Sequence, residues 1–348
     1  MAYTTVDDAG SFYNALTWTG DGSTTQAQTG LGFQPDFVWI KYRAGAESHV
    51  LFDSVRGVTD AINSNTTAAE ASLTGLKSFD ADGFSVGPDG KTGSNTYTYI
   101  GWSWKAGTTT GIAGSPSVTP SSYTFNQTSG FSAIAFTGNG VAGMTIPHGL
   151  GVAPDMVIVK RLDSTSDWAV YHSGIDATAP EDYQMVLNTT AARSDDVGGW
   201  NDTAPTATLV SLGANNNTNT ATFIAYCFTN IKGYSRFGNF TGNGNADGPF
   251  VYLGFRPAFL IVKDVTGSNN WTMFDDKREP AGNPTAEALQ PNTTVAEYDE
   301  TDGVDFLSNG FKVRESADWI NRSGQPTIYV AFASNPFVNS NGVPNNAY

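Results

Sequence analysis

Three short apolar stretches form the clearest hydrophobic pattern in the chain, at residues 35–41, 154–160 and 257–263. Each begins at a proline, ends at a lysine and is rich in β-branched and aromatic residues in between. Stretches of this length and composition, bounded by glycine and proline, are typical of buried strands rather than helices. A proline is tolerated at the start of a strand, where its missing N–H costs least. The pattern therefore predicts three buried strands.

A second pattern is alternation. Residues 97–104 alternate large apolar side chains with small or polar ones, and residues 221–228 and 327–332 are also rich in aromatics. A period of two indicates a strand with one buried face. Residues 84–86 and 311–313, each after a glycine, predict another strand that two parts of the chain share. Helical patterns are scarce.

The best helix candidates are residues 66–73 and 285–289. Both are too short to shape the architecture, since a helix of ordinary length has about three turns. The 38 glycines among the 348 residues, together with abundant Thr, Asn and Ser, indicate many turns instead.

The predicted strands recur in one order, which indicates a single module used three times. Each copy opens on a Thr-Gly step at Gly20, Gly138 or Gly242, and the apolar stretch follows. His49, Trp168 and Trp271 each stand 8 residues after the lysine that ends that stretch. An Asn-Thr-Thr then follows in every copy, at residues 65–67, 188–190 and 292–294.

The spacing of the copies indicates domains. The three Thr-Gly steps are 118 and 104 residues apart. Solenoid and propeller units repeat at roughly 20–50 residues, whereas about 100 residues is an ordinary domain length. We therefore expect an all-β chain of three tandem β-sandwich-like repeats of about 100 residues with little helix.

The expected boundaries follow from the repeats. We place the first copy at residues 1–106, the second at 131–233 and the third at 234–348. Residues 107–130, rich in Gly, Ser, Thr and Pro, are expected to form a linker or an arm.

Composition and charge exclude some functions. Asp and Glu number 33 against 18 Lys and Arg, so the net charge is −15. Nucleic-acid binding depends on cations that neutralise phosphates, so we expect no nucleic-acid partner and no attachment to anionic lipid. The single Cys227 lies in an apolar run, and no stretch of 18 apolar residues predicts membrane insertion. The N-terminal residues lack the features of a secretory signal, so we expect synthesis and folding in a cytoplasm.

Comparison of the copies weakens most catalytic hypotheses. Asp53 and Asp275 occupy matching positions, but the second copy has His172 there, so we interpret the position as an exposed strand end. Lys41, Lys160 and Lys263 recur at one position, where a lysine ordinarily reaches solvent or pairs with an acid.

No cofactor or metal is expected. The histidines His49, His148 and His172 fall at non-equivalent places, which does not predict a zinc site. Residues 243–248 alternate like a calcium loop but lack its leading Asp and its final Glu. No catalytic, cofactor-binding or metal-binding residue is assigned.

Trp200 is the aromatic residue that we expect in an exposed loop. It lies in the polar, glycine-rich stretch Gly198-Gly199-Trp200-Asn201-Asp202. Exposed tryptophans stack on sugar rings, so Trp200, Asn201 and Asp202 are the candidate contacts with a glycan or a partner protein. The tryptophans of the shared strands are expected in the core.

The motifs together resemble a known family. The Thr-Gly-Asn-Gly step, residues 148–160 (His-Gly-Leu-Gly-Val-Ala-Pro-Asp-Met-Val-Ile-Val-Lys) and residues 305–312 (Asp-Phe-Leu-Ser-Asn-Gly-Phe-Lys) resemble uncharacterised virion-associated proteins of tailed, especially marine, bacteriophages. Some members are described as tail-fibre-like or lectin-like. The resemblance covers about residues 21–337 and implies a virion structural protein present in many copies or as a homo-oligomer. It implies no catalytic residues.

The resemblance leaves the exact role open. The leading interpretation is a tail-associated or fibre-like protein that binds other virion proteins or a host surface glycan through loops. The alternative is a decoration or cement protein on the head shell. A third hypothesis, a polysaccharide-degrading enzyme, depends on Glu297, Asp299 and Glu300, which approach a glucanase pattern. The segments 54–64, 173–187 and 276–291 differ most between the copies and are the expected binding loops.

Overall fold

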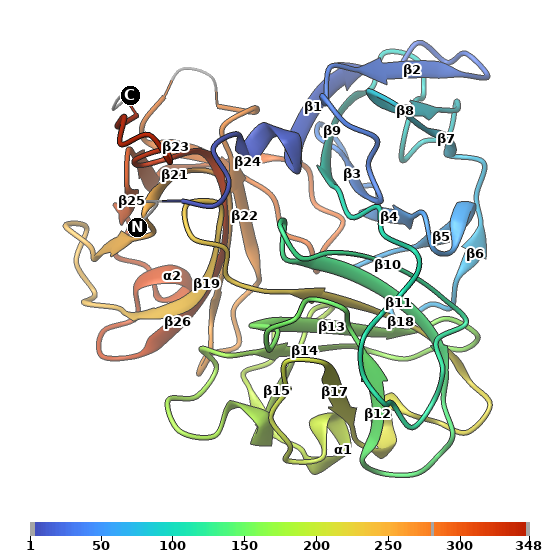
Figure 1. The fold of residues 1–348 in the computed structure, drawn as a ribbon. Helices are drawn as coiled ribbons and strands as arrows, with labels where there is room; N and C mark the ends of the chain where they lie inside the picture. The colour runs from blue at the N-terminus through green and yellow to red at the C-terminus, as the bar shows by residue number, and fades with distance from the viewer. Residues whose placement is uncertain (1–3, 280–281, 346–348) are drawn as a thin grey trace.

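The computed structural model describes residues 4–279 and 282–345, with Thr301 described by its backbone alone. The regular secondary structure is almost entirely antiparallel β-sheet, and the expected all-β class is confirmed. Three large sheets surround a common core, and each carries a smaller sheet on its outer face (Figure 1). The ends of the first and third copies at residues 1–3 and 346–348 lie outside the described residues.

The large sheet of the first copy has six strands. In spatial order these are β1 (Tyr13–Thr19), β9 (Thr98–Trp104), β3 (Phe37–Tyr42), β4 (Val50–Asp53), β5 (Gly57–Ile62) and β6 (Ala71–Ser72). Its smaller sheet is β2 (Gln26–Thr29), β8 (Gly83–Val86) and β7 (Leu76–Asp80).

The second large sheet has seven strands. In spatial order these are β10 (Ser122–Asn126), β11 (Phe131–Thr137), β18 (Thr222–Phe228), β13 (Met156–Arg161), β14 (Trp168–His172), β15 (Tyr183–Val186) and β16 (Ser194–Asp195). Its smaller sheet is β12 (Met144–Pro147) with β17 (Leu209–Leu212).

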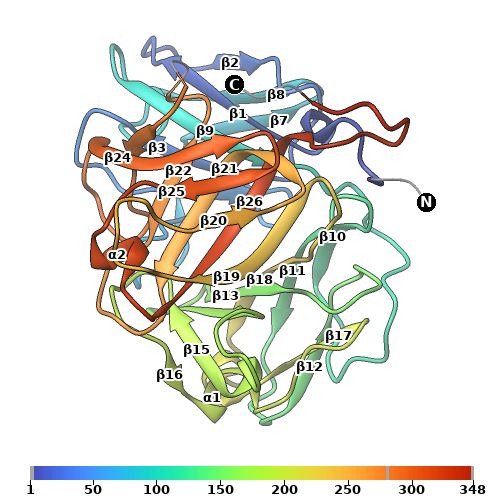
Figure 2. The same cartoon turned by 90° about the vertical axis from the view of Figure 1, so that its left-hand side faces the viewer.

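The third large sheet has four strands. They are β19 (Ser235–Thr241), β26 (Pro326–Pro336), β21 (Phe255–Asp264) and β22 (Thr272–Asp275). The smaller sheet is β20 (Phe250–Tyr252), β25 (Gly310–Val313), β24 (Tyr298–Leu307) and β23 (Thr285–Ala288). Figure 2 shows this third copy between the first copy above and the second below.

The apolar stretches form the central strands β3, β13 and β21, and both faces of these strands are buried. On β3, Trp39 belongs to the common core, whereas Val38 and Ile40 belong to a separate outer core of the first copy. Burial on both faces explains why these stretches are continuously apolar rather than alternating.

Aromatic side chains from all three large sheets meet in the common core. Phe37 of the first copy packs on Tyr226 of the second with ring centroids 4.6 Å apart. Tyr13 stacks on Phe332 of the third copy at 5.4 Å, and Phe228 contacts Phe332 at 6.0 Å. A cavity of about 30 Å³ remains where the sheets meet, and its lining comes from all three. The three copies therefore share one core, and the first and second copies each have a separate outer core as well.

The recurring Thr-Gly step has a steric cause. A Cβ on Gly20 would lie 2.2 Å from the Ser94 carbonyl oxygen, and a Cβ on Gly138 would lie 2.2 Å from that of Thr218. At Gly242 the corresponding distance, to Arg322, is 2.3 Å. The backbone of a neighbouring loop passes so closely in each copy that only glycine fits.

Both helix predictions are wrong. Residues 285–288 form strand β23, and residues 66–73 form a loop that ends in the short strand β6. Both segments pair with neighbouring strands instead, because isolated helices of this length gain too few hydrogen bonds to form. The short helices are α1 (Val197–Trp200), α2 (Asp318–Asn321), η1 (Ala9–Ser11), η2 (Pro180–Asp182) and η3 (Ala214–Asn216).

The segment between the first and second copies is partly a strand. Its residues 122–126 form β10, the edge strand of the second large sheet, in register with β11. Residues 107–121 run largely exposed over the surface. The domain boundaries themselves stay a prediction.

Candidate functional site

Two buried clusters of charged side chains lie where the copies meet. In the first copy, Arg56 donates from Nε to Asp53 Oδ2 at 2.6 Å and from Nη1 to Glu70 Oε1 at 2.8 Å. In the third copy, Arg278 donates in the same way to Asp275 at 2.6 Å and to Glu297 at 3.0 Å. Asp53 and Asp275 are fully buried. The two clusters occupy equivalent sequence positions.

Each cluster is completed by the neighbouring copy. The hydroxyl of Tyr226, in the second copy, donates to Asp53 Oδ2 at 2.6 Å. The indole N–H of Trp102, in the first copy, donates to Asp275 Oδ2 at 3.0 Å. Burial raises the pKa of the Tyr226 phenol well above its ordinary value, so it stays a donor.

The second copy uses a neutral version of the same contact. His172 replaces the aspartate, Ile175 the arginine and Arg193 the glutamate. Val330 stands where the other two interfaces have Tyr226 or Trp102, and His172 Nε2 lies 3.1 Å from the carbonyl oxygen of its neighbour Tyr329. His172 Nδ1 accepts from the Gly174 N–H at 3.0 Å, so the ring is satisfied in its neutral form. The three interfaces thus close a ring of copies.

Two of the three recurring lysines donate hydrogen bonds across these interfaces. Lys160 of the second copy donates to the Thr67 carbonyl of the first at 3.0 Å, and Lys41 reaches the Thr294 carbonyl of the third at 3.3 Å. Lys263 donates within its own copy, to the carbonyls of Asp264 and Gly267. Burial lowers the pKa of each lysine to about 8. The acceptors of the bonds from Lys160 and Lys41 lie in the Asn-Thr-Thr loops of the first and third copies.

The interpretation of Asp53, His172 and Asp275 as exposed strand ends is wrong, because the next copy covers them. The lysines do not reach solvent either; all three are buried against backbone carbonyls. One sequence signal could have revealed the clusters: the aspartate, arginine and glutamate are present together in two copies and replaced together in the third. Coupled replacement of that kind indicates contact.

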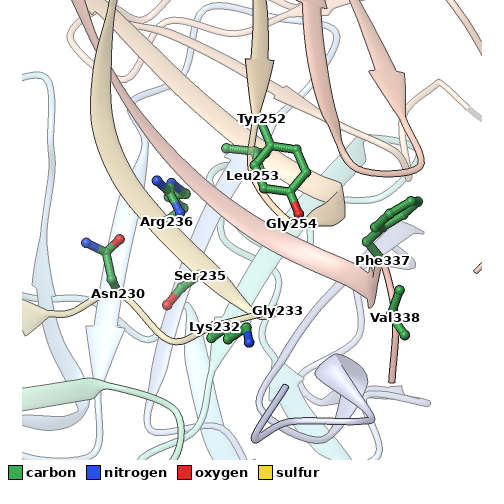
Figure 3. A pocket seen from close by; sticks show the side chains of 10 residues that line it. All are labelled: Asn230, Lys232, Gly233, Ser235, Arg236, Tyr252, Leu253, Gly254, Phe337 and Val338. Atoms are coloured by element: carbon green, nitrogen blue, oxygen red, sulfur yellow. The ribbon is translucent and has the colours of Figure 1, made fainter. Parts of the chain in front are cut away.

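An open groove lined by two cations lies at the edge of the third copy. It has a volume of about 330 Å³ (Figure 3). Its lining combines basic, amide, phenol and apolar groups: Asn230, Lys232, Gly233, Ser235, Arg236, Tyr252, Leu253, Gly254, Phe337 and Val338. Arg236 and Lys232 are exposed, and the Tyr252 side chain keeps 55% of its surface exposed. The groove carries two cations on a chain of net charge −15.

The groove residues are specific to the third copy. Arg236 aligns with Asn14 and Ser132, and Tyr252 aligns with Gly30 and Gly149. The guanidinium of Arg236 also interacts with the hydroxyl of buried Tyr329. Residues 230–236, 252–254 and 337–338 converge only in the folded chain, so alignment of the copies alone does not reveal this groove.

In the second copy the equivalent place is filled by the chain itself. Phe125 of β10 pairs with Ser132, the counterpart of Arg236. A Cβ on Gly149, the counterpart of Tyr252, would lie 2.6 Å from the Phe125 ring. Gln127 donates from Nε2 to the Gly149 carbonyl at 3.0 Å. The third copy leaves this place open to solvent.

The expectation that Trp200 lies in an exposed loop is wrong. The residue ends helix α1 and is 1% exposed, with its ring edge-on to Tyr171 at 5.8 Å. The glycine-rich stretch folds back onto the outer core of the second copy, so the indole cannot stack on a sugar. Asn201 and Asp202 form a left-handed turn at the surface, and their role as contacts stays a prediction.

The first of the glucanase-like acids, Glu297, is held in ion pairs with two arginines. Both oxygens of Glu297 accept from Arg43 or Arg278, at 2.6 to 3.1 Å, so Glu297 joins the first copy to the third. Burial raises the pKa of Glu300 above its ordinary value. Within residues 4–279 and 282–345, no group of three or more His, Cys, Asp or Glu is placed to hold a metal ion. The side chains of Asn243 and Asn245 are used in hydrogen bonds of their own turn.

The expected binding loops contain strands. Segments 54–64, 173–187 and 276–291 contain β5, β15 and β23, each following the second shared strand of its copy. Among the described residues, no helix is long and apolar enough to cross a membrane.

Comparison with known proteins identifies a family but no relative of known function. Neither a curated protein nor a solved structure matches the chain. One family model, described as a domain of unknown function (DUF7483), matches residues 8–336. Since the match covers nearly the whole chain, the protein belongs to the DUF7483 family.

Proposed function

We propose that the chain is a non-enzymatic structural protein of a bacteriophage virion. In the leading version it is tail-associated or fibre-like and binds a host surface or neighbouring virion proteins. The sequence resemblance described above motivates the virion assignment, and the geometry of the three copies supports a scaffold.

The observation that carries the proposal is the closed contact among the three copies. The inner faces of the sheets share one core, and charged or polar clusters at Asp53, His172 and Asp275 are covered by the adjacent copy. A unit held together on both faces of every central strand is a rigid support for surface groups. Rigid scaffolds with variable edges are a common way to build binding surfaces.

Repetition in a particle would compensate for weak contacts. When each copy of the protein carries one shallow site, linking many copies raises the overall avidity by about 10²–10⁴ without new contacts. We therefore expect multiple copies in each virion, with other virion proteins or a host glycan as partners.

A decoration or cement protein on the head shell is the second candidate, because a rigid acidic β-unit suits that place as well. A polysaccharide-degrading enzyme is less favoured. Glu297, the first acid of the glucanase-like run, is held by Arg43 and Arg278 and does not line the groove described above.

The decisive experiment is localisation in a purified phage particle. Cryo-electron microscopy of virions from a phage that encodes this chain is expected to show it on the tail, in many copies. Density on the head shell would favour the decoration role instead. Absence from purified particles, checked by mass spectrometry, would refute both versions.

A further inference from the structure

We propose that the groove of the third copy, lined by Lys232, Arg236 and Tyr252, binds an acidic saccharide through its carboxylate and one sugar face. The inference deepens the proposed surface-binding role and rests on it for biological meaning. Its chemistry stands on the groove alone.

The ligand must be recognised by side chains, because the backbone edge beside the groove is already used. The outward N–H of Phe237 donates to Asn230 Oδ1 at 2.7 Å. Ser235 and Ile231 exchange backbone hydrogen bonds at 2.9 and 3.2 Å. An added peptide strand, such as β10 supplies in the second copy, would find these groups occupied.

The side chains on offer favour a negatively charged ligand. Arg236 is exposed, and the N–H donors of its guanidinium match a carboxylate in bidentate geometry. Lys232 lines the same groove, and among residues 4–279 and 282–345 no acid is part of its lining. Other open pockets, beside Asp8 and Asp276 or beside Asp302 and Asp305, carry carboxylates.

The aromatic and amide groups favour a sugar over a simple anion. Tyr252 is more than half exposed, and its ring lies between Arg236 and Phe337 (Figure 3). A flat ring beside polar donors suits a pyranose, whose C–H face is apolar and whose hydroxyls need partners. The Tyr252 hydroxyl and the Asn230 amide can serve as those partners. A volume of about 330 Å³ is at the lower end for small-molecule sites and fits a short oligosaccharide.

The test is titration of the full chain with acidic saccharides by isothermal calorimetry and saturation-transfer NMR. The panel is trigalacturonate, glucuronate and sialyllactose. Methyl-esterified trigalacturonate is the matched neutral probe, and inorganic phosphate is the simple anion. We expect binding of at least one acidic saccharide at millimolar concentration, and about tenfold weaker binding of the methyl ester, since a charge-assisted bond is lost.

Variants assign the binding to the groove. Arg236→Gln is expected to weaken binding about tenfold and Tyr252→Ala about threefold or more. The control variants Arg161→Gln and Tyr97→Ala remove a partly exposed arginine and an exposed tyrosine elsewhere and should leave Kd unchanged. Circular dichroism checks that all four variants fold.

Three results would overturn the inference. The first is no binding of any acidic saccharide at about 10 mM, roughly tenfold above the expected millimolar range. The second is equal affinity for inorganic phosphate, and the third is binding that Arg236→Gln and Tyr252→Ala leave unchanged. The outcome is separate from the virion test. Saccharide binding by a protein absent from particles would refute only the virion assignment, and a virion protein that fails this titration would refute only the groove assignment.

Discussion

The second and third copies place different polar groups at equivalent positions of their interfaces, a neutral histidine in the second and a paired aspartate in the third. In the third copy, Asp275 is buried, paired with Arg278 and capped by Trp102 of the next copy. In the second copy, His172 occupies the equivalent position as a neutral ring that bonds the Tyr329 carbonyl. The difference teaches that the position needs a satisfied polar group, and that charge is optional.

Whether an interface carries an aspartate or a histidine depends on the residue that faces it in the neighbouring copy. A buried carboxylate needs a cation and donors, and Trp102 and Tyr226 supply N–H and O–H groups to Asp275 and Asp53. Val330 has no polar group to offer, and a histidine that uses a backbone carbonyl fits beside it. Because the three interfaces carry different pairs of residues, the polar group at each interface is matched to the residue that it faces in the neighbouring copy.

The largest expected effect comes from breaking a charged cluster. Arg278→Ala would leave Asp275 buried without its cation, and we expect a loss of about 3–5 kcal/mol in the free energy of unfolding. Urea denaturation followed by tryptophan fluorescence measures the change.

The matched control is Arg193→Ala in the second copy. Arg193 pairs with Asp176 nearer the surface, so its loss should cost only about 0–1 kcal/mol. Equal costs for the two variants would contradict the contrast between the buried charged cluster of the third copy and an ion pair nearer the surface.

A smaller effect is expected on acidification. Burial lowers the pKa of His172 to about 4 from its ordinary 6.5. Because the folded pKa lies below the unfolded one, the contribution to stability is complete above pH 6.5 and is lost as the pH falls toward 4. For His172 alone we expect about 2 kcal/mol less stability at pH 5 than at pH 8.

The variant His172→Gln isolates this contribution. Its unfolding free energy should vary less between pH 8 and pH 5 than that of the unchanged protein. The comparison is needed because His148 also has a lowered pKa, about 4, whereas burial raises that of Asp276 to about 6 and acts in the opposite direction. An unchanged pH dependence in the variant would show that His172 is not the titrating group.

The smallest effect concerns the segment between the first two copies. Brief subtilisin treatment should cut first within residues 107–121, which run exposed before β10 begins. Mass spectrometry of the fragments locates the cut. A first cut within residues 150–230 would contradict the proposed boundaries.

Much of the fold was predictable because short apolar stretches have few alternatives. The strands at 35–41, 154–160 and 257–263 are confirmed, as β3, β13 and β21. Trp200 was misplaced because its neighbours are polar and glycine-rich, and its burial depends on Tyr171, which is distant in sequence. The strand-end aspartates were misplaced for a similar reason, since only packing of another copy removes them from water.

The groove could not be predicted from local patterns. Arg236, Tyr252 and Phe337 are distant in sequence and lie in no shared motif. Its place became recognisable by comparison with the second copy, where Phe125 and Gln127 occupy the equivalent position.

The central claim is that the three copies form one cooperative unit through a common core. Differential scanning calorimetry of the whole chain tests it most directly. We predict a single transition whose calorimetric and van't Hoff enthalpies are equal, because unfolding one copy exposes the core of the others. Separate transitions, or a calorimetric enthalpy about three times the van't Hoff value, would show that the copies unfold independently and would contradict it.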